Sequence, residues 1–159
     1  MPIPPYVAAL RAKIGHDPLL VVGGSAIVRD AAGHVLLIRR GDNGRWALPG
    51  GMMEPGERIA DCAVRETREE TGVEVEVVRL VGIYSDPAPG HVVLDNGDEL
   101  YVVIASFECR VVGGAPRPDG DESLEVAYFP PDELPPSVAP WHRLRIQDAL
   151  AGREAAFVR

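Results

Sequence analysis

Lysine is nearly absent from this sequence of 159 residues. Lys13 is the single lysine, and the formal net charge at pH 7 is −8. A groove that binds DNA or RNA needs a basic patch of lysine and arginine side chains that neutralise the phosphates. The composition therefore argues against a nucleic-acid polymer as a partner.

Cysteines and long apolar runs are also scarce. Cys62 and Cys109 lack CxxC spacing, so we expect them to be reduced, structural thiols. No apolar run approaches the roughly 20 residues of a membrane-spanning helix. The N-terminus, MPIPPYVAALRAKIGH, lacks the charged start and apolar core of a signal peptide. The sequence predicts a cytoplasmic protein without a membrane partner.

The chain does contain enough apolar material for one domain. Hydrophobic residues make up 46% of the sequence and charged residues 25%, which are ordinary values for a globular protein. The 15 arginines leave a small anionic substrate open, because a guanidinium group binds a phosphate through two parallel hydrogen bonds. A small phosphorylated ligand is therefore compatible with the negative net charge.

The most informative stretch is residues 51–73, GMMEPGERIADCAVRETREETGV. A loop rich in Gly and Pro leads into a predicted helix, on which Glu66 shares a face with Glu69 and Glu70. Repulsion between like charges at this spacing costs roughly 0.2–0.5 kcal/mol per pair. A divalent cation would turn that repulsion into binding, because carboxylate oxygens suit hard cations. The charges alone leave open a solvated acidic face that binds nothing.

Seven residues of this stretch follow a fixed spacing: Gly51, Glu57, Arg65, Glu66, Glu69, Glu70 and Gly72. The spacing resembles the Nudix box of the MutT-like hydrolases and matches that pattern at every fixed position. One variable position departs from the family, because Thr67 stands where an aliphatic residue is usual, which concerns helix packing more than chemistry. The resemblance implies the α/β Nudix fold, an α/β/α sandwich with a mixed β-sheet.

The resemblance also implies a reaction and a metal site. Nudix hydrolases cut a diphosphate that links a nucleoside to another group, and they use Mg²⁺, for which Mn²⁺ is a substitute. The metal neutralises the phosphate oxygens and lowers the pKa of the attacking water. The metal ligands that the resemblance implies are Glu70, Glu66, Glu69, Glu57 and the backbone carbonyl of Gly50 or Gly51.

The catalytic residues follow from the same resemblance. Arg65 would orient a glutamate by ion pairing. The general base is a box glutamate, Glu66 or Glu69, in some members of the family. In others it comes from a distant loop, where Glu122 and Glu125 are the candidates in this sequence.

Candidate substrate-binding residues lie outside the box. Arg39 and its neighbour Arg40 end a predicted strand, where one of them can reach a phosphate. Trp46 and Tyr84 are aromatic side chains that can stack on a nucleobase, and Tyr101 and Phe107 are further candidates. Each of these aromatic residues is equally compatible with a place in the core.

The substrate is the least defined part of the prediction. Pro87 and Pro89 bracket the position of a proline that ADP-ribose pyrophosphatases often carry after the box, which favours ADP-ribose or a nucleotide sugar. A nucleoside triphosphate pyrophosphohydrolase of the MutT type, including one for oxidised nucleotides, is the alternative.

Two other classes of protein share the fold. A non-catalytic Nudix-fold nucleotide-binding module would be expected to lose box acids. An isoprenoid diphosphate isomerase would need Cys62 or Cys109 as a catalytic thiol.

The order of elements predicts helices packed on a mixed sheet. Residues 1–16 are expected to form an N-terminal helical extension that packs on the domain or on a second subunit of a homodimer, and residues 17–159 the Nudix domain. The predicted helices are Tyr6–Ile14, Arg58–Thr71 and Trp141–Leu150. The predicted strands are Leu19–Arg29 and Val35–Arg40, expected to pair as a hairpin, followed by Val73–Tyr84, His91–Leu94, Glu99–Val112 and Leu124–Phe129.

Overall fold

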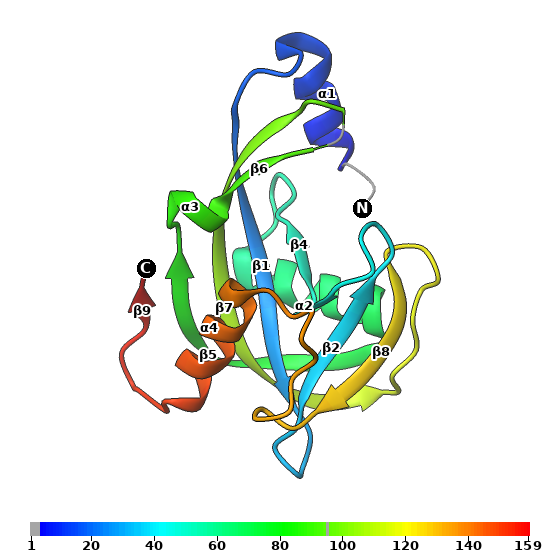
Figure 1. Cartoon of the computed structure of the whole chain (residues 1–159), viewed down its shortest axis with the longest axis vertical. Helices are drawn as coiled ribbons and strands as arrows, with labels where there is room; N and C mark the ends of the chain where they lie inside the picture. The colour runs from blue at the N-terminus through cyan, green and yellow to red at the C-terminus, as the bar shows by residue number, and fades with distance from the viewer. Residues whose placement is uncertain (1–3, 95) are drawn as a thin grey trace.

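A computed structural model describes residues 4–94 and 96–159 (Figure 1). In these ranges, nine strands form one mixed sheet. The helices are α1 (Pro5–Ile14), α2 (Ile59–Thr71), α3 (Pro87–Gly90) and α4 (Pro140–Leu150). The strands are β1 (Leu19–Arg29), β2 (Val35–Arg40), β3 (Trp46–Ala47), β4 (Gly50–Met52), β5 (Val73–Tyr84), β6 (His91–Val93), β7 (Glu99–Gly114), β8 (Ser123–Phe129) and β9 (Phe157–Val158). Residues 1–3 of the expected extension, and Asp95 of the β6–β7 turn, lie outside the described residues.

The centre of the sheet is the pair β1 and β7. The two strands run parallel over the whole of β1, from Leu19 opposite Leu100 to Arg29 opposite Arg110. The main path of the sheet is β3-β2-β1-β7-β5-β9, with β4, β6 and β8 attached to β1, β7 and β2. Strands buried on both faces need apolar side chains on both faces, which explains the nearly continuous apolar sequence of β1.

The expected hairpin of β1 and β2 forms only at its turn. The one pair between the two strands is Arg29 with Val35, and beyond it β2 pairs with β8 instead. The outer part of β1 pairs with β4, where Ser25 lies opposite Gly50. The sheet therefore splits beside β1, and the gap admits the short strand that carries Gly50 and Gly51.

Two apolar cores lie on the two faces of the sheet. One packs under α2 and the other under α4, and Figure 1 shows α4 in front of the sheet and α2 behind it. Successive residues of a strand point into opposite cores: Leu36 of β2 packs in the core under α2, and Leu37 packs in the core under α4. This arrangement confirms the predicted α/β/α sandwich.

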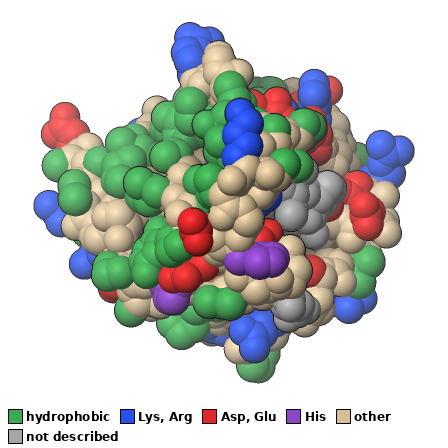
Figure 2. Space-filling model, turned by 90° about the horizontal axis from the view of Figure 1, so that it is seen from above, with side chains coloured by type: hydrophobic (Ala, Val, Ile, Leu, Met, Phe, Trp, Pro, Cys, Tyr) green, Lys and Arg blue, Asp and Glu red, His purple; other side chains and the backbone are tan. Residues whose placement is uncertain are grey.

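Helix α1 is attached at one end of the sheet. Val7 is buried, Arg11 donates from Nη2 to the carbonyl of Glu99 at 2.7 Å, and His16 Nδ1 lies 2.8 Å from a carboxylate oxygen of Asp98. Figure 2, which views the molecule from this end, shows apolar side chains gathered on part of its surface. Among the helices in the described part of the chain, none is long and apolar enough to cross a membrane.

Candidate active site

Helix α2 carries three of the candidate acids on one stretch. It ends at Gly72, whose left-handed conformation (φ 69°) is open to glycine at little cost. Thr67 stands where the family usually has an aliphatic residue, and its side chain is buried. Its hydroxyl is satisfied because it donates to the carbonyl of Ala63 at 2.7 Å. The helix therefore packs against the sheet despite the polar residue in its buried face.

Glu70 is the most buried of these acids. It is 2% exposed, and Oε2 accepts a hydrogen bond from the backbone N–H of Gly50 at 2.8 Å. Burial raises the pKa of Glu70 to about 8, the negative charges of Glu66 and Glu122 push in the same direction, and the Gly50 hydrogen bond opposes them. A cation near this carboxyl group would favour its ionised form.

Glu66 lies directly against the backbone of Gly51. A Cβ atom at Gly51 would stand 2.4 Å from the carboxyl carbon of Glu66, so only glycine leaves room for this carboxylate. Burial also raises the pKa of Glu66, with Glu122 and Glu69 adding to the effect and Arg65 opposing it. The two glycines of β4 thus bring the backbone within reach of both acids, the buried Glu70 and the partly buried Glu66.

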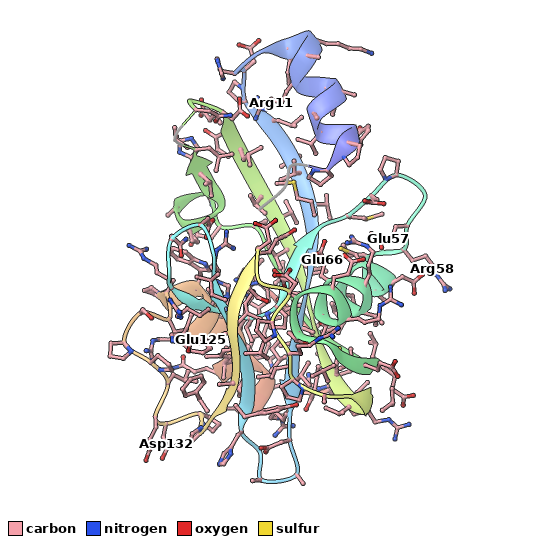
Figure 3. All side chains as sticks on the ribbon, turned by 90° about the vertical axis from the view of Figure 1, so that its right-hand side faces the viewer. Arg11, Glu57, Arg58, Glu66, Glu125 and Asp132 are labelled. Atoms are coloured by element: carbon pink, nitrogen blue, oxygen red, sulfur yellow. The ribbon has the colours of Figure 1, made fainter. Side chains whose placement is uncertain are left out.

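Arg65 is shared by three of the candidate acids. Its guanidinium nitrogens lie 2.8 Å from Glu57, 2.7 Å from Glu66 and 3.2 Å from Glu69. Figure 3 shows Glu57 and Glu66 side by side next to α2. One positive charge cannot balance three carboxylates, so the group keeps an excess of negative charge. The orienting role of Arg65 stays a prediction.

Glu122 joins the acids from a distant loop. It lines a small cavity together with Arg40, Asp42 and Glu70. The loop is fixed to the end of β2 because the N–H of Gly41 donates to the carbonyl of Glu122 at 2.8 Å. Burial raises the pKa of Glu122, and Asp119, Asp121 and Glu69 add to the effect. The structure therefore brings Glu122, but not Glu125, next to Glu70.

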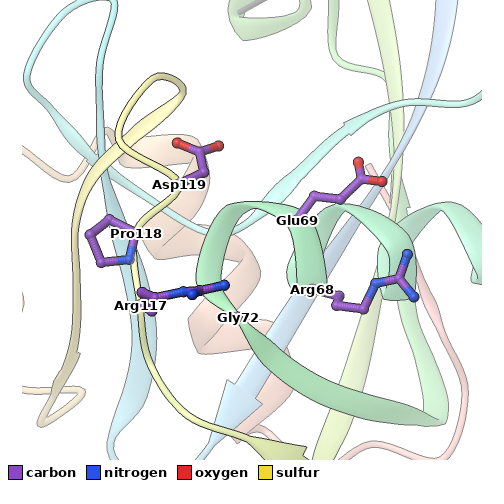
Figure 4. A pocket seen from close by; sticks show the side chains of 6 residues that line it. All are labelled: Arg68, Glu69, Gly72, Arg117, Pro118 and Asp119. Carbon is purple, nitrogen blue, oxygen red and sulfur yellow. The ribbon is translucent and has the colours of Figure 1, made fainter.

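Glu69 faces a second cavity at the end of α2. This cavity has a volume of about 410 Å³, and Figure 4 shows acids along one side of it and arginines along the other. The Glu69 side chain is 51% exposed. Solvent therefore reaches the Glu69 carboxylate. The residues that line this cavity are Arg68, Glu69, Gly72, Arg117, Pro118 and Asp119.

The predicted substrate-binding residues, Arg39, Trp46 and Tyr84, make their contacts away from the acids of α2. Arg39 pairs with Glu125 on β8 at 2.6 Å, and Glu125 lies on the side of β8 away from α2 (Figure 3). Trp46 packs edge-on against Phe129, with 4.8 Å between ring centroids. The hydroxyl of Tyr84 donates to Asp148 at 3.0 Å.

Neighbouring residues of a strand point to opposite faces, so Arg40 turns towards the acids while Arg39 turns away. The alternation of side chains along the strand was visible in the sequence, but which arginine faces the acids depended on the partner strands. From the sequence, Arg40 was a candidate only as the neighbour of Arg39, and Asp42 was not a candidate. The structure brings both residues to this cavity.

The donor set fits a hard divalent cation. Glu66 and Glu70 carry raised pKa values, Gly51 makes room for a carboxylate, and carboxylate oxygens are the ligands that Mg²⁺ prefers. In residues 4–94 and 96–159, no three side chains of His, Cys, Asp or Glu yet converge closely enough to hold an ion between them. Glu57 and Glu66 are turned towards Arg65 instead.

The cysteines have the environment of structural thiols. Cys62 and Cys109 are buried, and burial raises the pKa of each to about 12. The thiol of Cys62 donates to the carbonyl of Gly51 at 3.6 Å. That contact leaves the carbonyl of Gly50 as the better backbone candidate for a cation, and it gives no support to a catalytic thiol.

Comparison with known proteins gives a consistent family. The NUDIX domain model matches residues 20–149. A solved NUDIX hydrolase from Nitrosomonas europaea superimposes with a TM-score of 0.66 at 27% identity, covering 87% of this chain and 76% of that one.

Curated relatives point to the same family. A MutT-like protein of Streptomyces ambofaciens is 38% identical over 135 residues, 85% of this chain and 80% of that protein. A putative 8-oxo-dGTP diphosphatase of Bacillus subtilis is 31% identical over 83% of this chain and 81% of its own length. An ADP-ribose pyrophosphatase of Methanocaldococcus jannaschii is 38% identical over 64% of this chain and 57% of its own length.

Proposed function

The chain belongs to the Nudix hydrolase family, and on that basis we propose that it is a Mg²⁺-dependent hydrolase that cleaves the diphosphate linkage of ADP-ribose or a related nucleotide sugar. The family hydrolyses nucleoside diphosphate derivatives or oxidised nucleotides. The observation that carries the proposal is the convergence of two carboxyl groups with little solvent exposure, Glu66 and Glu70, on the Gly50–Gly51 backbone.

We propose that Glu70 and Glu66 hold the cation together with the carbonyl of Gly50. Glu57 completes the site through water, and Arg65 keeps Glu57 and Glu66 in place by its ion pairs. When bound, the cation supplies charge neutralisation at the phosphates and a lower pKa for the attacking water. Mn²⁺ also accepts oxygen ligands and is the expected substitute.

Glu122 is the general base that the geometry favours. It lies at the Glu70 cavity, has a raised pKa and forms no ion pair within the described ranges. A carboxylate with a raised pKa is a better proton acceptor near neutral pH. Glu69 and Glu66 stay as box alternatives, but both are in contact with Arg65. We propose that Arg40, rather than Arg39, contacts a substrate phosphate near Glu70, in exchange for its ion pair with Asp42.

An oxidised nucleoside triphosphate is the second candidate substrate. It is favoured by the similarity to the putative 8-oxo-dGTP diphosphatase, which extends over most of both chains. The ADP-ribose proposal rests on Pro87 and Pro89, which lie in the short helix α3, and on the shorter match to an ADP-ribose pyrophosphatase. The two substrates yield different products and can be separated by one assay.

The test is a product assay with Mg²⁺. ADP-ribose should yield AMP and ribose 5-phosphate, whereas 8-oxo-dGTP should yield the monophosphate and pyrophosphate. A higher kcat/KM for ADP-ribose would support the first proposal, and the reverse would favour the second. Nucleotide binding without any hydrolysis would instead indicate a non-catalytic module.

We also propose a homodimer and a cytoplasmic location. Exposed apolar side chains at the α1 end support self-association, because large exposed apolar patches mark interaction sites. Leu20 is 68% exposed, Val93 63% and Tyr101 38%. Light scattering should give twice the chain mass, and Leu20→Glu should shift the protein to a monomer.

The division into an extension of residues 1–16 and a domain of residues 17–159 stays a prediction.

A further inference from the structure

Arg145 is a buried cation without a carboxylate partner in the described ranges. It is 5% exposed and lies between α4 and β1. Nε donates to the carbonyl of Trp141 at 3.1 Å, Nη1 donates to Ser25 Oγ at 3.1 Å, and Nη2 lies 3.0 Å from Nδ1 of His142. Burial lowers the pKa of Arg145 to about 10, so the group stays charged at neutral pH. A buried charge is costly without an opposite charge, and packing alone would favour a neutral side chain.

The partners of Arg145 hold one short segment of chain. Ser25 is the strand partner of Gly50, and a Cβ atom at Gly50 would stand 2.7 Å from both Cα and Cβ of Ser25. The N–H of Leu48 donates to Nδ1 of His142 at 3.4 Å. From the α2 side, Gly50 donates its N–H to Glu70. The segment Leu48–Gly50 is therefore held between the two helices.

His142 has the protonation state that this arrangement requires. Its Nδ1 accepts from the Leu48 N–H and faces Arg145, so the proton of the neutral ring is assigned to Nε2. Burial lowers the pKa of His142 well below its ordinary value, and the charges of Arg145 and Arg40 add to the effect. A neutral acceptor and a charged donor are thus matched on one helix.

We propose that Arg145 is a positioning residue for the metal-binding turn. Through Ser25 and His142 it fixes where Gly50 presents its N–H to Glu70 and its carbonyl to the cation. The inference rests on the proposed function, because it takes Gly50 and Glu70 as part of the metal site. A role in packing alone would affect stability without affecting the turn.

Calorimetric titration with Mn²⁺ alone tests the proposal. Arg145→Met should weaken Mn²⁺ binding at least tenfold, and Arg145→Lys should weaken it less, since it keeps the charge without the planar fork. Arg143→Met is the matched control, because Arg143 lies on the same helix and donates to the carbonyls of Val138, Leu134 and Pro135. The control should lower the melting temperature and leave Mn²⁺ affinity within twofold. A folded Arg145→Met protein with wild-type affinity would overturn the proposal.

Amide hydrogen exchange in metal-free protein supplies an independent measurement. The Gly50 amide should exchange at least tenfold faster in Arg145→Met, while the Ala105 amide in β7 keeps its rate. If Arg145→Met fails to fold, His142→Asn and His142→Leu replace it, since the Asn oxygen can accept from Leu48. Equal exchange of the Leu48 amide in those two variants would overturn the inference. Failure of the wild type to bind Mn²⁺ would instead contradict the proposed metal site, and the exchange rates would still decide the role of Arg145.

Discussion

Helices α2 and α4 cover opposite faces of one sheet and carry unbalanced charges of opposite sign. On α2, Arg65 serves three carboxylates, and Glu70 forms no ion pair within the described ranges. On α4, Asp148 is matched by Arg159, but Arg145 has only neutral partners. The acids of α2 reach solvent at Glu69, which lines the cavity of about 410 Å³, so a ligand can balance their charge, whereas the charge of Arg145 is enclosed and must be balanced by protein dipoles. The α2 side therefore has the charge expected of a ligand-binding site, whereas the α4 side holds that site in place from within the protein.

The largest expected effect is on the α2 side. Glu70→Gln should reduce kcat at least a hundredfold, the scale of losing a major electrostatic contributor. The fold should persist because the Gln oxygen can still accept the Gly50 hydrogen bond. Steady-state kinetics with Mg²⁺ and thermal unfolding measure the two effects. Near-normal turnover of a folded variant would refute the assignment of the metal site.

Arg65→Met sharpens the comparison by removing the shared cation of α2. The free energy of unfolding should fall by about 1.5–3 kcal/mol without Mg²⁺, the range of hydrogen bonds to charged groups, and saturating Mg²⁺ should restore part of it. Urea unfolding with and without Mg²⁺ measures both. Arg58→Met is the control, because Arg58 is an exposed surface partner of Asp61 and should change stability little. Unchanged stability of Arg65→Met would show that the three acids need no counterion.

Asp148→Asn tests the balanced pair of α4. Arg159, with help from the Tyr84 hydroxyl, holds the pKa of Asp148 below its ordinary value. The ionised carboxylate therefore stabilises the fold above the unfolded pKa near 4, and this contribution is lost as the pH falls through the lower folded pKa. The variant should be about 1–2 kcal/mol less stable at pH 7. Denaturation series should show this difference shrinking below pH 4, and a constant difference would contradict the ion-pair account.

The smallest expected effect is that of the cysteines. Replacing Cys62 and Cys109 together by Ala should leave turnover within about threefold and cost about 1 kcal/mol of stability per site, the usual size of a core substitution. Product assays and unfolding curves provide the measurement. A hundredfold loss of turnover in a folded variant would favour a catalytic thiol and weaken the contrast between the two helices.

Long, strongly patterned elements were predictable from the sequence. β1, β2 and β5 have the expected bounds, because runs of apolar or alternating residues between turn signals define a strand. β3, β4 and β9 have only two or three residues, too few for a periodic pattern. The separation of β1 from β2 could not be predicted either, since it depends on competition from β4 for β1 and from β8 for β2.

The candidate site was also predictable only in part. Helical spacing placed Glu66, Glu69 and Glu70 together, but it could not show that Glu70 is buried and Glu69 exposed. It also could not show that Arg40, and not Arg39, meets Glu122. Those contacts join segments far apart in the chain.

The sequence by itself determined the family pattern, the α2 acids and the alternation of the long strands. These follow from local geometry, because residue spacing fixes which side chains share a face. Only the tertiary structure decided that β4 enters the gap beside β1 and that α4 reaches Gly50 through Ser25 and His142. Strand register and helix packing set such contacts, and both depend on the whole sheet rather than on neighbouring residues.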